Sequence, residues 1–230
     1  MQTFKVLSAL LTYPERELVG DLPALRQALV EEELLGPAEM QELGKLMARL
    51  GSTDLIDLQE DYVGLFDRSR SLSLHLFEHV HGDSRDRGQA MVDLIGLYRR
   101  NGLDVAEREL PDYLPLFLEF LSLVSLGEAR AMLADTAHIL ARIEARLLQR
   151  GSPYAGVLIA LRTLAGVTVE AAVADEEDLD SPEAIDRAWE EVPVAFGGVG
   201  ADPASCSAGC SFATTAGRRY DASSPGTSHA

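Results

Sequence analysis

The sequence has few aromatic residues and few β-branched runs, and this limits the folds that it can adopt. Aromatic residues make up 6% of the 230 residues although 47% are hydrophobic, so leucine, alanine and valine must form most of the core. Leucine and alanine favour helices, and no segment shows the sustained apolar–polar alternation that is typical of strands. We therefore predict an all-α protein, built as a single-domain helical bundle.

Cysteine is also scarce. Cys206 and Cys210 are the only two in the chain, and both lie outside the predicted helical domain. They have no further cysteine or neighbouring histidine to complete a four-ligand metal site, and no disulfide framework holds the fold. The sequence also lacks a glycine-rich phosphate loop and a nucleophile elbow. It therefore predicts no catalytic residue, no metal and no cofactor.

Basic residues are outnumbered by acidic ones. Lysine and arginine total 20 against 37 aspartates and glutamates, which gives a formal net charge of −17. Such a surface repels phosphate backbones, so we expect no binding to nucleic acid. The negative charge would attract a basic peptide or protein, or it would only keep the protein soluble. The composition leaves both explanations open.

Long apolar runs are missing as well. No run approaches the ~20 residues that a helix needs to cross a bilayer. The N-terminal stretch MQTFKVLSALLTYP lacks a small-residue cleavage site of the kind that ends a signal peptide. We therefore expect a cytoplasmic protein that does not insert into a membrane.

Apolar periodicity and capping residues divide the chain into predicted helices. A second helix is expected to follow an Asp21 cap, with Pro23 in its first turn. The other expected helices cover residues 3–11, 37–50, 55–66 (after a Ser52 or Asp54 cap), 71–81, 84–101, 111–124, 129–149, 154–174 and 181–189. Residues 1–196 would form the helical domain. Residues 197–230 are rich in Gly, Ala, Ser and Thr, and we predict that they are disordered because they cannot bury enough apolar surface.

The stretch from Tyr62 to Leu94 holds three of the five histidines. His75, Glu78 and His79 match the pattern H-x-x-E-H, in which two histidines one helical turn apart bind zinc and the glutamate activates water. A structural interpretation is favoured, in which a short helix places these histidines at the edge of an apolar stripe. The stripe would consist of Leu74, Phe77 and Val80.

Four arginines flank this short helix, namely Arg68, Arg70, Arg85 and Arg87. Guanidinium groups so placed could bind an anion such as a phosphate. Pairing with local carboxylates is favoured, because such partners are abundant. The expected partners are Asp67, Glu78, Asp83 and Asp86. Together with His75 and His79 the arginines would form a polar junction between packed helices.

The segment from Pro111 to Val124 is apolar on nearly all sides and should be the buried centre of the bundle. Glu119 is the lone carboxylate beyond the first turn of this apolar helix and needs a partner, for which Arg142 or Arg146 is expected. Glu109 and Asp112 lie at the start of the helix. They either cap it and favour its positive end, or form a carboxylate ring for a cationic group of a bound peptide.

Four segments, read together, resemble a known protein family. They are residues 62–94, ELPDYLPLFLEFLS (109–122), HILARIEARL (138–147) and WEEVPVAFG (189–197). In this order and spacing they resemble the nitrate reductase molybdenum-cofactor assembly chaperones, the NarJ-type branch of the TorD-like redox-enzyme maturation chaperones. The resemblance covers residues 1 to about 197.

This resemblance implies a cytoplasmic, all-helical and non-catalytic chaperone. Such a protein binds the N-terminal segment of the apo catalytic (alpha) subunit of respiratory nitrate reductase. It holds that subunit until molybdenum cofactor is inserted and the complex reaches the membrane, and it is not part of the finished enzyme. Proteins that deliver the molybdenum cofactor would be further partners.

The resemblance also suggests which residues contact the client. Tyr62, Leu65 and Phe66 match a Y-x-x-L-F element of the family, which could equally be core. Glu109 to Tyr113 stand in the place of an E-P-x-D-H hinge motif of the wider family, with Leu and Tyr in place of its Pro and His. The expected peptide-binding residues are Tyr62, Leu65, Phe66, Glu109, Asp112, Tyr113, Phe117 and Glu119. Two other hypotheses remain open, a zinc-dependent hydrolase that uses the H-x-x-E-H motif and an acidic helical adaptor without a maturation role.

Overall fold

The computed structural model describes residues 1–80, 85–106 and 109–167. The helices in these ranges are α1 (Gln2–Leu10), α2 (Arg16–Glu32), α3 (Pro37–Ser52), α4 (Leu55–Tyr62), α5 (Arg85–Arg100), α6 (Leu114–Leu123), α7 (Leu126–Gln149) and α8 (Ala155–Ala165). A π-helical turn η1 (Val63–Asp67) and two 3₁₀ turns, η2 (Arg70–Leu72) and η3 (Leu76–His79), lie between α4 and α5. The described residues contain an isolated β-bridge but no strand. The prediction of an all-helical fold is confirmed.

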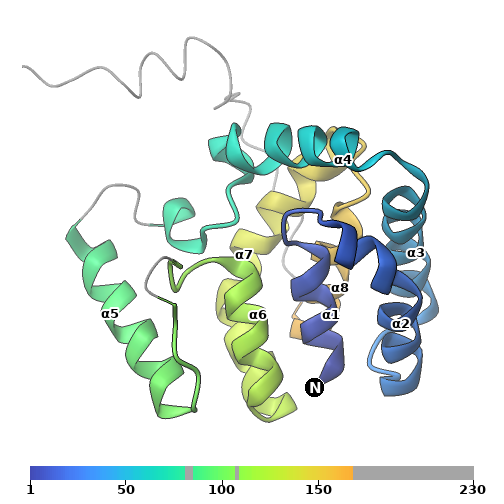
Figure 1. Ribbon diagram of the computed structural model, residues 1–230. Helices are drawn as coiled ribbons and strands as arrows, with labels where there is room; N and C mark the ends of the chain where they lie inside the picture. The colour runs from blue at the N-terminus through green and yellow to red at the C-terminus, as the bar shows by residue number, and fades with distance from the viewer. Residues whose placement is uncertain (81–84, 107–108, 168–230) are drawn as a thin grey trace, which may run out of the picture. The chain divides into compact units, whose positions relative to one another are not determined.

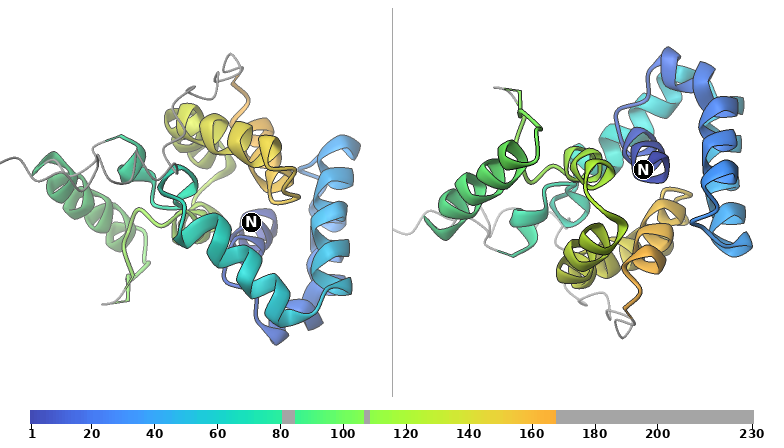
Figure 2. Two further views of the ribbon diagram at one scale, coloured as in Figure 1. Left: turned by 90° about the horizontal axis from the view of Figure 1, so that it is seen from above. Right: turned by 90° about the horizontal axis from the view of Figure 1, so that it is seen from below.

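Helix α6 lies at the centre of the packed helices, as its apolar sequence predicts. Leu114, Leu118, Phe120 and Leu121 are completely buried on it. Helix α1 packs along α6, and α7 forms a close pair with α8, which also packs on α3. Helix α4 crosses above α1 and α6 at one end (Figures 1 and 2). The crossing places η1 and the following turns beside the start of α6, where a partly polar cavity forms.

Capping residues explain where several helices begin. The Asp54 side chain accepts a hydrogen bond from the backbone N–H of Ile56 at 2.9 Å, so Asp54 is the cap of α4. At the start of α7, Ser125 and Glu128 form a reciprocal capping box. This helix therefore begins at Leu126 and not at Ala129, where the apolar pattern alone placed it.

The prediction for the second helix was wrong. Helix α2 begins at Arg16, and Pro23 lies inside it, so Asp21 is an exposed mid-helix residue and not a cap. Leu22 and Leu29 are both buried and lie two turns apart on one face. Because this apolar face continues on the N-terminal side of Pro23, packing overrides the usual preference of proline for a first turn.

Two helices of the C-terminal half also differ from expectation. Helix α6 starts at Leu114, with Pro115 in its first turn, because the preceding Pro111–Tyr113 segment pairs with another part of the chain. Helix α8 ends at Ala165 and not near residue 174, since Gly166 adopts a left-handed conformation with φ of +67°. Such a glycine is a common helix terminator.

The short helix expected over residues 71–81 was wrong. Turns η2 and η3 are separated by an extended stretch, in which His75 forms an antiparallel β-bridge with Tyr113. Four consecutive residues, Ser71 to Leu74, are buried, and Leu76 at the start of η3 is buried as well. Val80, which was expected in the buried stripe, is 51% exposed. The bridge to Tyr113, and not a helical period, therefore sets which side chains of this segment are enclosed.

Several predictions lie outside the described residues. They are the helix at 181–189, the tail at 197–230 with Cys206 and Cys210, and the restart of the chain at Asp83. The boundary between residues 196 and 197 therefore stays a prediction.

Candidate functional site

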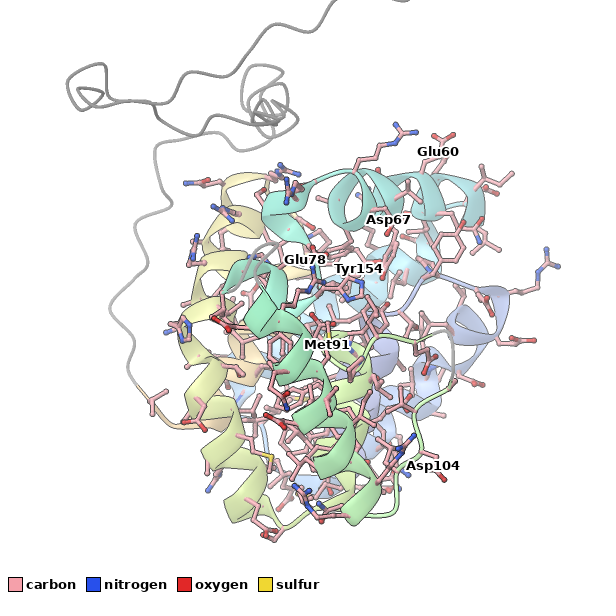
Figure 3. The ribbon with its side chains drawn as sticks, turned by 90° about the vertical axis from the view of Figure 1, so that its left-hand side faces the viewer. Glu60, Asp67, Glu78, Met91, Asp104 and Tyr154 are labelled. Carbon is pink, nitrogen blue, oxygen red and sulfur yellow. The ribbon has the colours of Figure 1, made fainter. Side chains whose placement is uncertain are left out.

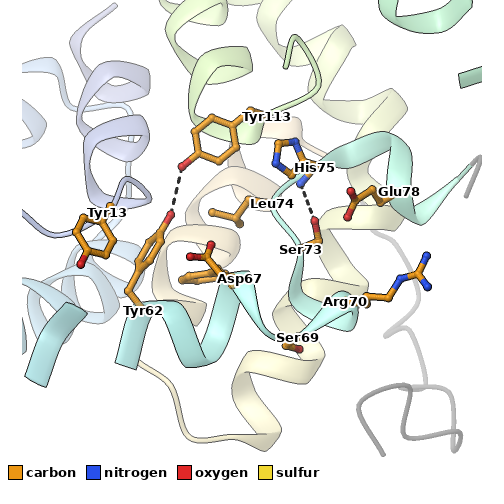
Figure 4. A pocket seen from close by; sticks show the side chains of 11 residues that line it. Tyr13, Tyr62, Asp67, Ser69, Arg70, Ser73, Leu74, His75, Glu78 and Tyr113 are labelled. Atoms are coloured by element: carbon orange, nitrogen blue, oxygen red, sulfur yellow. Dashed lines mark hydrogen bonds between the residues drawn. The ribbon is translucent and has the colours of Figure 1, made fainter. Parts of the chain in front are cut away.

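A cavity of about 600 Å³ lies where α4 and η1 meet the 69–78 segment and the start of α6 (Figure 4). We call it the site cavity. Its lining is formed by Tyr13, Tyr62, Phe66, Asp67, Ser69, Arg70, Ser73, Leu74, His75, Glu78 and Tyr113. One side of the cavity is aromatic and the other carries charged groups, so it can take a ligand that has both apolar and polar parts.

The aromatic side is held by hydroxyl contacts. The Tyr62 hydroxyl donates its hydrogen to the backbone carbonyl of Leu11 at 2.9 Å. It therefore accepts the hydrogen bond from the Tyr113 hydroxyl, which lies 3.2 Å away (Figure 4). The rings of Tyr13 and Phe66 pack against Tyr62 with centroid separations of 5.6 and 4.9 Å. Burial raises the pKa of the Tyr62 hydroxyl far above its ordinary value, so this group stays protonated.

The local fold explains this wall. Tyr62 and Phe66 are one helical turn apart and both are buried. Between them α4 widens into η1, in which the N–H of Arg68 bonds to the carbonyl of Val63. The wider turn ends the helix at the cavity and leaves the Asp67 side chain exposed at its rim.

The charged side is organised by one buried carboxylate. Asp112 is completely buried, and its Oδ2 accepts a hydrogen bond from the N–H of Phe77 at 3.1 Å. Its Oδ1 lies 3.4 Å from Nδ1 of His75, which donates to it. This hydrogen bond raises the pKa of His75 above its ordinary value, although burial opposes the shift. Because Nδ1 is engaged by Asp112, the ring is held in a fixed orientation in the cavity wall.

Backbone bonds hold the same two segments together. The N–H of Leu76 bonds to the carbonyl of Asp112 at 3.0 Å, and the N–H of Leu114 bonds to the carbonyl of Leu74 at 2.8 Å. From α5, Arg87 reaches Oε1 of Glu78 at 3.3 Å and lies 3.9 Å from Oδ2 of Asp112. Figure 3 shows Glu78 near the N-terminal end of α5. The segment that precedes α6 thus fixes the charged wall of the cavity.

Comparison with known proteins identifies the family. The model of the nitrate reductase delta subunit family matches residues 32–160. The nitrate reductase molybdenum cofactor assembly chaperone NarJ of Escherichia coli (strain K12) is 43% identical over 196 residues, which are 83% of each chain. This chain belongs to the nitrate reductase delta subunit family. The resemblance to NarJ-type chaperones is therefore confirmed.

One further relative and one solved structure are also similar to this chain. A candidate NarJ assembly chaperone of Bacillus subtilis (strain 168) is 32% identical over 173 residues, which are 74% of this chain and 92% of the relative. The crystal structure of a candidate redox enzyme maturation protein from Archaeoglobus fulgidus matches with a TM-score of 0.51 and 24% identity, over 73% of this chain and 94% of that one. This last likeness supports the fold alone.

The site residues that the sequence predicts, for peptide binding and for the polar junction, do not all meet in one place. The site cavity brings together five of them, namely Tyr62, Phe66, Arg70, His75 and Tyr113. Asp112 lies beneath His75, and Arg87 lies beside Glu78. Arg85 begins α5. The pairing of Arg87 with Glu78 confirms that a local ion pair forms here.

The remaining expected residues lie elsewhere. Leu65 lines a cavity of about 250 Å³ with Tyr154, and Arg68 lines one of about 590 Å³ with Tyr13. Phe117 is 5% exposed and belongs to the core, whereas Glu109 is exposed. The roles of Leu65, Phe117 and Glu109 in peptide binding, and of Arg68 in the polar junction, stay predictions.

Glu119 is not paired with the arginines that we expected. It lies on an exposed side of α6 and lines a cavity of about 470 Å³ with Lys5. Burial raises the pKa of Glu119, and the nearby Lys5 opposes that rise. Arg146 instead donates to the carbonyl of Ser71 at 2.8 Å. The expectation was wrong because Glu119 points toward α1 and not toward α7.

The zinc-hydrolase hypothesis loses its geometric basis. His75 is extended and turned to Asp112, whereas Nε2 of His79 donates to the carbonyl of Ser73 at 2.8 Å. Burial lowers the pKa of His79. The two rings therefore do not lie one helical turn apart on a common face. In the described ranges no three His, Cys, Asp or Glu side chains are grouped as a metal site would require.

The sequence interpretation missed some cavity residues. In the sequence, Tyr13 marks only the end of the first helix, and no motif includes Ser69 or Ser73 in a site. For Ser73 the alternation Ser71-Leu72-Ser73-Leu74-His75-Leu76 is a signal of extended backbone, whereas no local pattern points to Tyr13 or Ser69. No helix among the described residues is long and apolar enough to cross a bilayer.

Proposed function

We propose that this chain is a system-specific chaperone of respiratory nitrate reductase. It acts in the cytoplasm, binds the apo catalytic subunit through its N-terminal segment, and holds it for insertion of molybdenum cofactor and assembly at the membrane. It makes or breaks no bonds and is absent from the finished enzyme. The likeness to the Escherichia coli assembly chaperone NarJ over 83% of both chains supports this proposal.

One observation links the proposed function to the site cavity. The Y-x-x-L-F element and the Glu109–Tyr113 segment both carried the family resemblance, and they lie about fifty residues apart in the sequence. Their tyrosines, Tyr62 and Tyr113, meet through their hydroxyl groups at 3.2 Å in the wall of the site cavity. We therefore place client binding at this cavity.

The surroundings suit an amphipathic segment. Tyr13 is 42% exposed and lines both the site cavity and the neighbouring cavity, in which Ile56 is 66% exposed. These side chains offer an apolar path from one cavity to the next, and a client helix would place anchors of one face along it. Asp67, beside Tyr62, and Glu78, on the far side of His75, both line the site cavity (Figure 4). They would attract a lysine or arginine of the client.

Calorimetry with a peptide from the N-terminus of the nitrate reductase catalytic subunit tests this proposal. We expect micromolar or tighter binding that weakens as salt rises. Tyr13→Ala should weaken binding about tenfold, because it removes an exposed aromatic contact. Leu148→Ala is the matched control, since Leu148 is 54% exposed on α7 and lines none of these cavities. No binding by the unaltered protein at low salt would refute the proposal.

A further inference from the structure

An arginine of the chain itself contacts the charged wall of the site cavity. Arg87 projects from α5 and places Nη2 3.3 Å from Oε1 of Glu78, a residue that lines the cavity. The same nitrogen lies 3.9 Å from Oδ2 of the buried Asp112. A guanidinium group therefore already stands beside the carboxylate that a cationic client group would approach.

This contact is one that a ligand can replace. The side chains of Arg87 and Glu78 are 23% and 36% exposed. Ion pairs that remain open to water contribute little to stability. Asp112 also accepts the N–H of Phe77 and the His75 ring, so it keeps two partners when Arg87 moves.

Helix α5 has a second anchor, which does not depend on Arg87. Tyr98 near its C-terminal end is completely buried and donates to the carbonyl of Pro111 at 2.8 Å. The Tyr98 ring packs on Phe120 of α6 with centroids 4.7 Å apart. Loss of the Arg87 contact would therefore free one end of α5 while the other end stays in the core.

We propose that, before the client binds, Arg87 occupies the position beside Glu78 that a cationic side chain of the client takes in the complex. A lysine or arginine side chain of the client then displaces Arg87 from Glu78. This inference rests on the proposed function. It assigns Glu78 as the carboxylate that receives the client's cation, with Asp67 and the tyrosine rings as neighbours in the same cavity. A client segment without a lysine or arginine cannot replace the Arg87–Glu78 contact that is lost when Arg87 is displaced. Arg87 therefore favours clients that carry a cationic side chain over clients that are only apolar.

The test compares two peptides by calorimetry. One is the N-terminal segment of the nitrate reductase catalytic subunit, and the other is the same segment with every Lys and Arg replaced by Gln. Arg87→Gln should tighten binding of the first peptide about threefold, because the internal competitor is gone. It should not tighten binding of the second. Arg87→Lys keeps a cation at this position and should bind the first peptide as the unaltered protein does.

Two control experiments distinguish the removal of the competing Arg87 cation from a general effect of the changed net charge. Arg99→Gln makes the same change in charge at an exposed position near the other end of α5, and it should leave the affinity within about twofold of the unaltered protein. In a Glu78→Gln background, Arg87→Gln should no longer tighten binding, since the shared carboxylate is absent. Thermal unfolding of each variant confirms that it is folded at the temperature of the titration.

The outcomes distinguish the two proposals. If the unaltered protein binds neither peptide, the proposed function fails. If it binds the cationic peptide and Arg87→Gln, folded, leaves that affinity unchanged or weaker, the displacement of Arg87 is refuted while the proposed function stands. Equal tightening by Arg99→Gln would also refute it, because that result would reflect net charge alone.

Discussion

At the scale of single residues, Asp112 explains most about the site. A completely buried carboxylate is unfavourable unless hydrogen bonds and nearby cations compensate it. The N–H of Phe77 and Nδ1 of His75 provide that compensation, with Arg87 at a longer distance. A side chain so enclosed cannot touch a client. Its place in the structure is that of a positioning residue, which acts on the cavity through His75.

The contributions of His75 and His79 to the stability of the folded protein should change with pH in opposite directions. The pKa of His75 is raised by Asp112, so its contribution to stability is present in acid and is lost as the pH rises through the folded value. The pKa of His79 is lowered by burial, so its contribution is present above the ordinary value and is lost as the pH falls.

Urea unfolding of His75→Gln and His79→Gln at about pH 5.5 and about pH 8 checks this expectation. The free energy of unfolding lost in His75→Gln, relative to the unaltered protein, should be greater at the acidic pH. The loss in His79→Gln should be smaller at the acidic pH. Each variant serves as the control of the other, and a change in the same direction for both would contradict the assigned environments.

At the scale of helices, the contact between α3 and α8 depends on a glycine. A Cβ atom added at Gly156 would lie 2.9 Å from the backbone carbonyl carbon of Glu42, and backbone cannot move aside as a side-chain end can. Gly44 on α3 has open space around it and no positive φ. These two helical glycines therefore provide a matched pair.

We expect Gly156→Ala to lower the free energy of unfolding by about 1–3 kcal/mol, because α3 and α8 must separate slightly. Gly44→Ala should raise it by up to ~1 kcal/mol, since alanine restricts the unfolded chain and favours a helix. Denaturant unfolding of both variants measures the two effects. A stabilised Gly156→Ala variant would show that the helices are not so closely packed.

How well the sequence predicts a helix or turn also differs from one element to the next. The starts of α3 and α4 follow from Gly36-Pro37 and Asp54, where the chain itself supplies the turn or the cap, whereas α4 ends at Tyr62, before the residue 66 that was expected. The 71–81 segment was misjudged because its alternation spans only three leucines, too few to outweigh the helical spacing of neighbouring residues. Its extended form is fixed by pairing with residues 112–114, a partner that local sequence does not reveal.

At the scale of the whole molecule, the division of the chain into a helical domain and a C-terminal tail can be tested directly. Removal of residues 197–230 should leave thermal unfolding and client-peptide binding unchanged, because this segment has few large apolar residues and its charges cancel. Circular dichroism and calorimetry measure the two properties. A loss of helicity or of binding would mean that the domain extends beyond residue 196.

The sequence alone determined the all-helical class, the buried centre formed by α6 and the family of this chain. These properties depend on composition, on periodicity along one helix and on runs of residues that stay contiguous. Only the tertiary structure decided that Tyr62 meets Tyr113, that Asp112 is buried beneath His75 and that Arg87 stands beside Glu78. Such contacts join segments that are far apart in sequence, and they are set by how the helices pack against one another and not by any local preference.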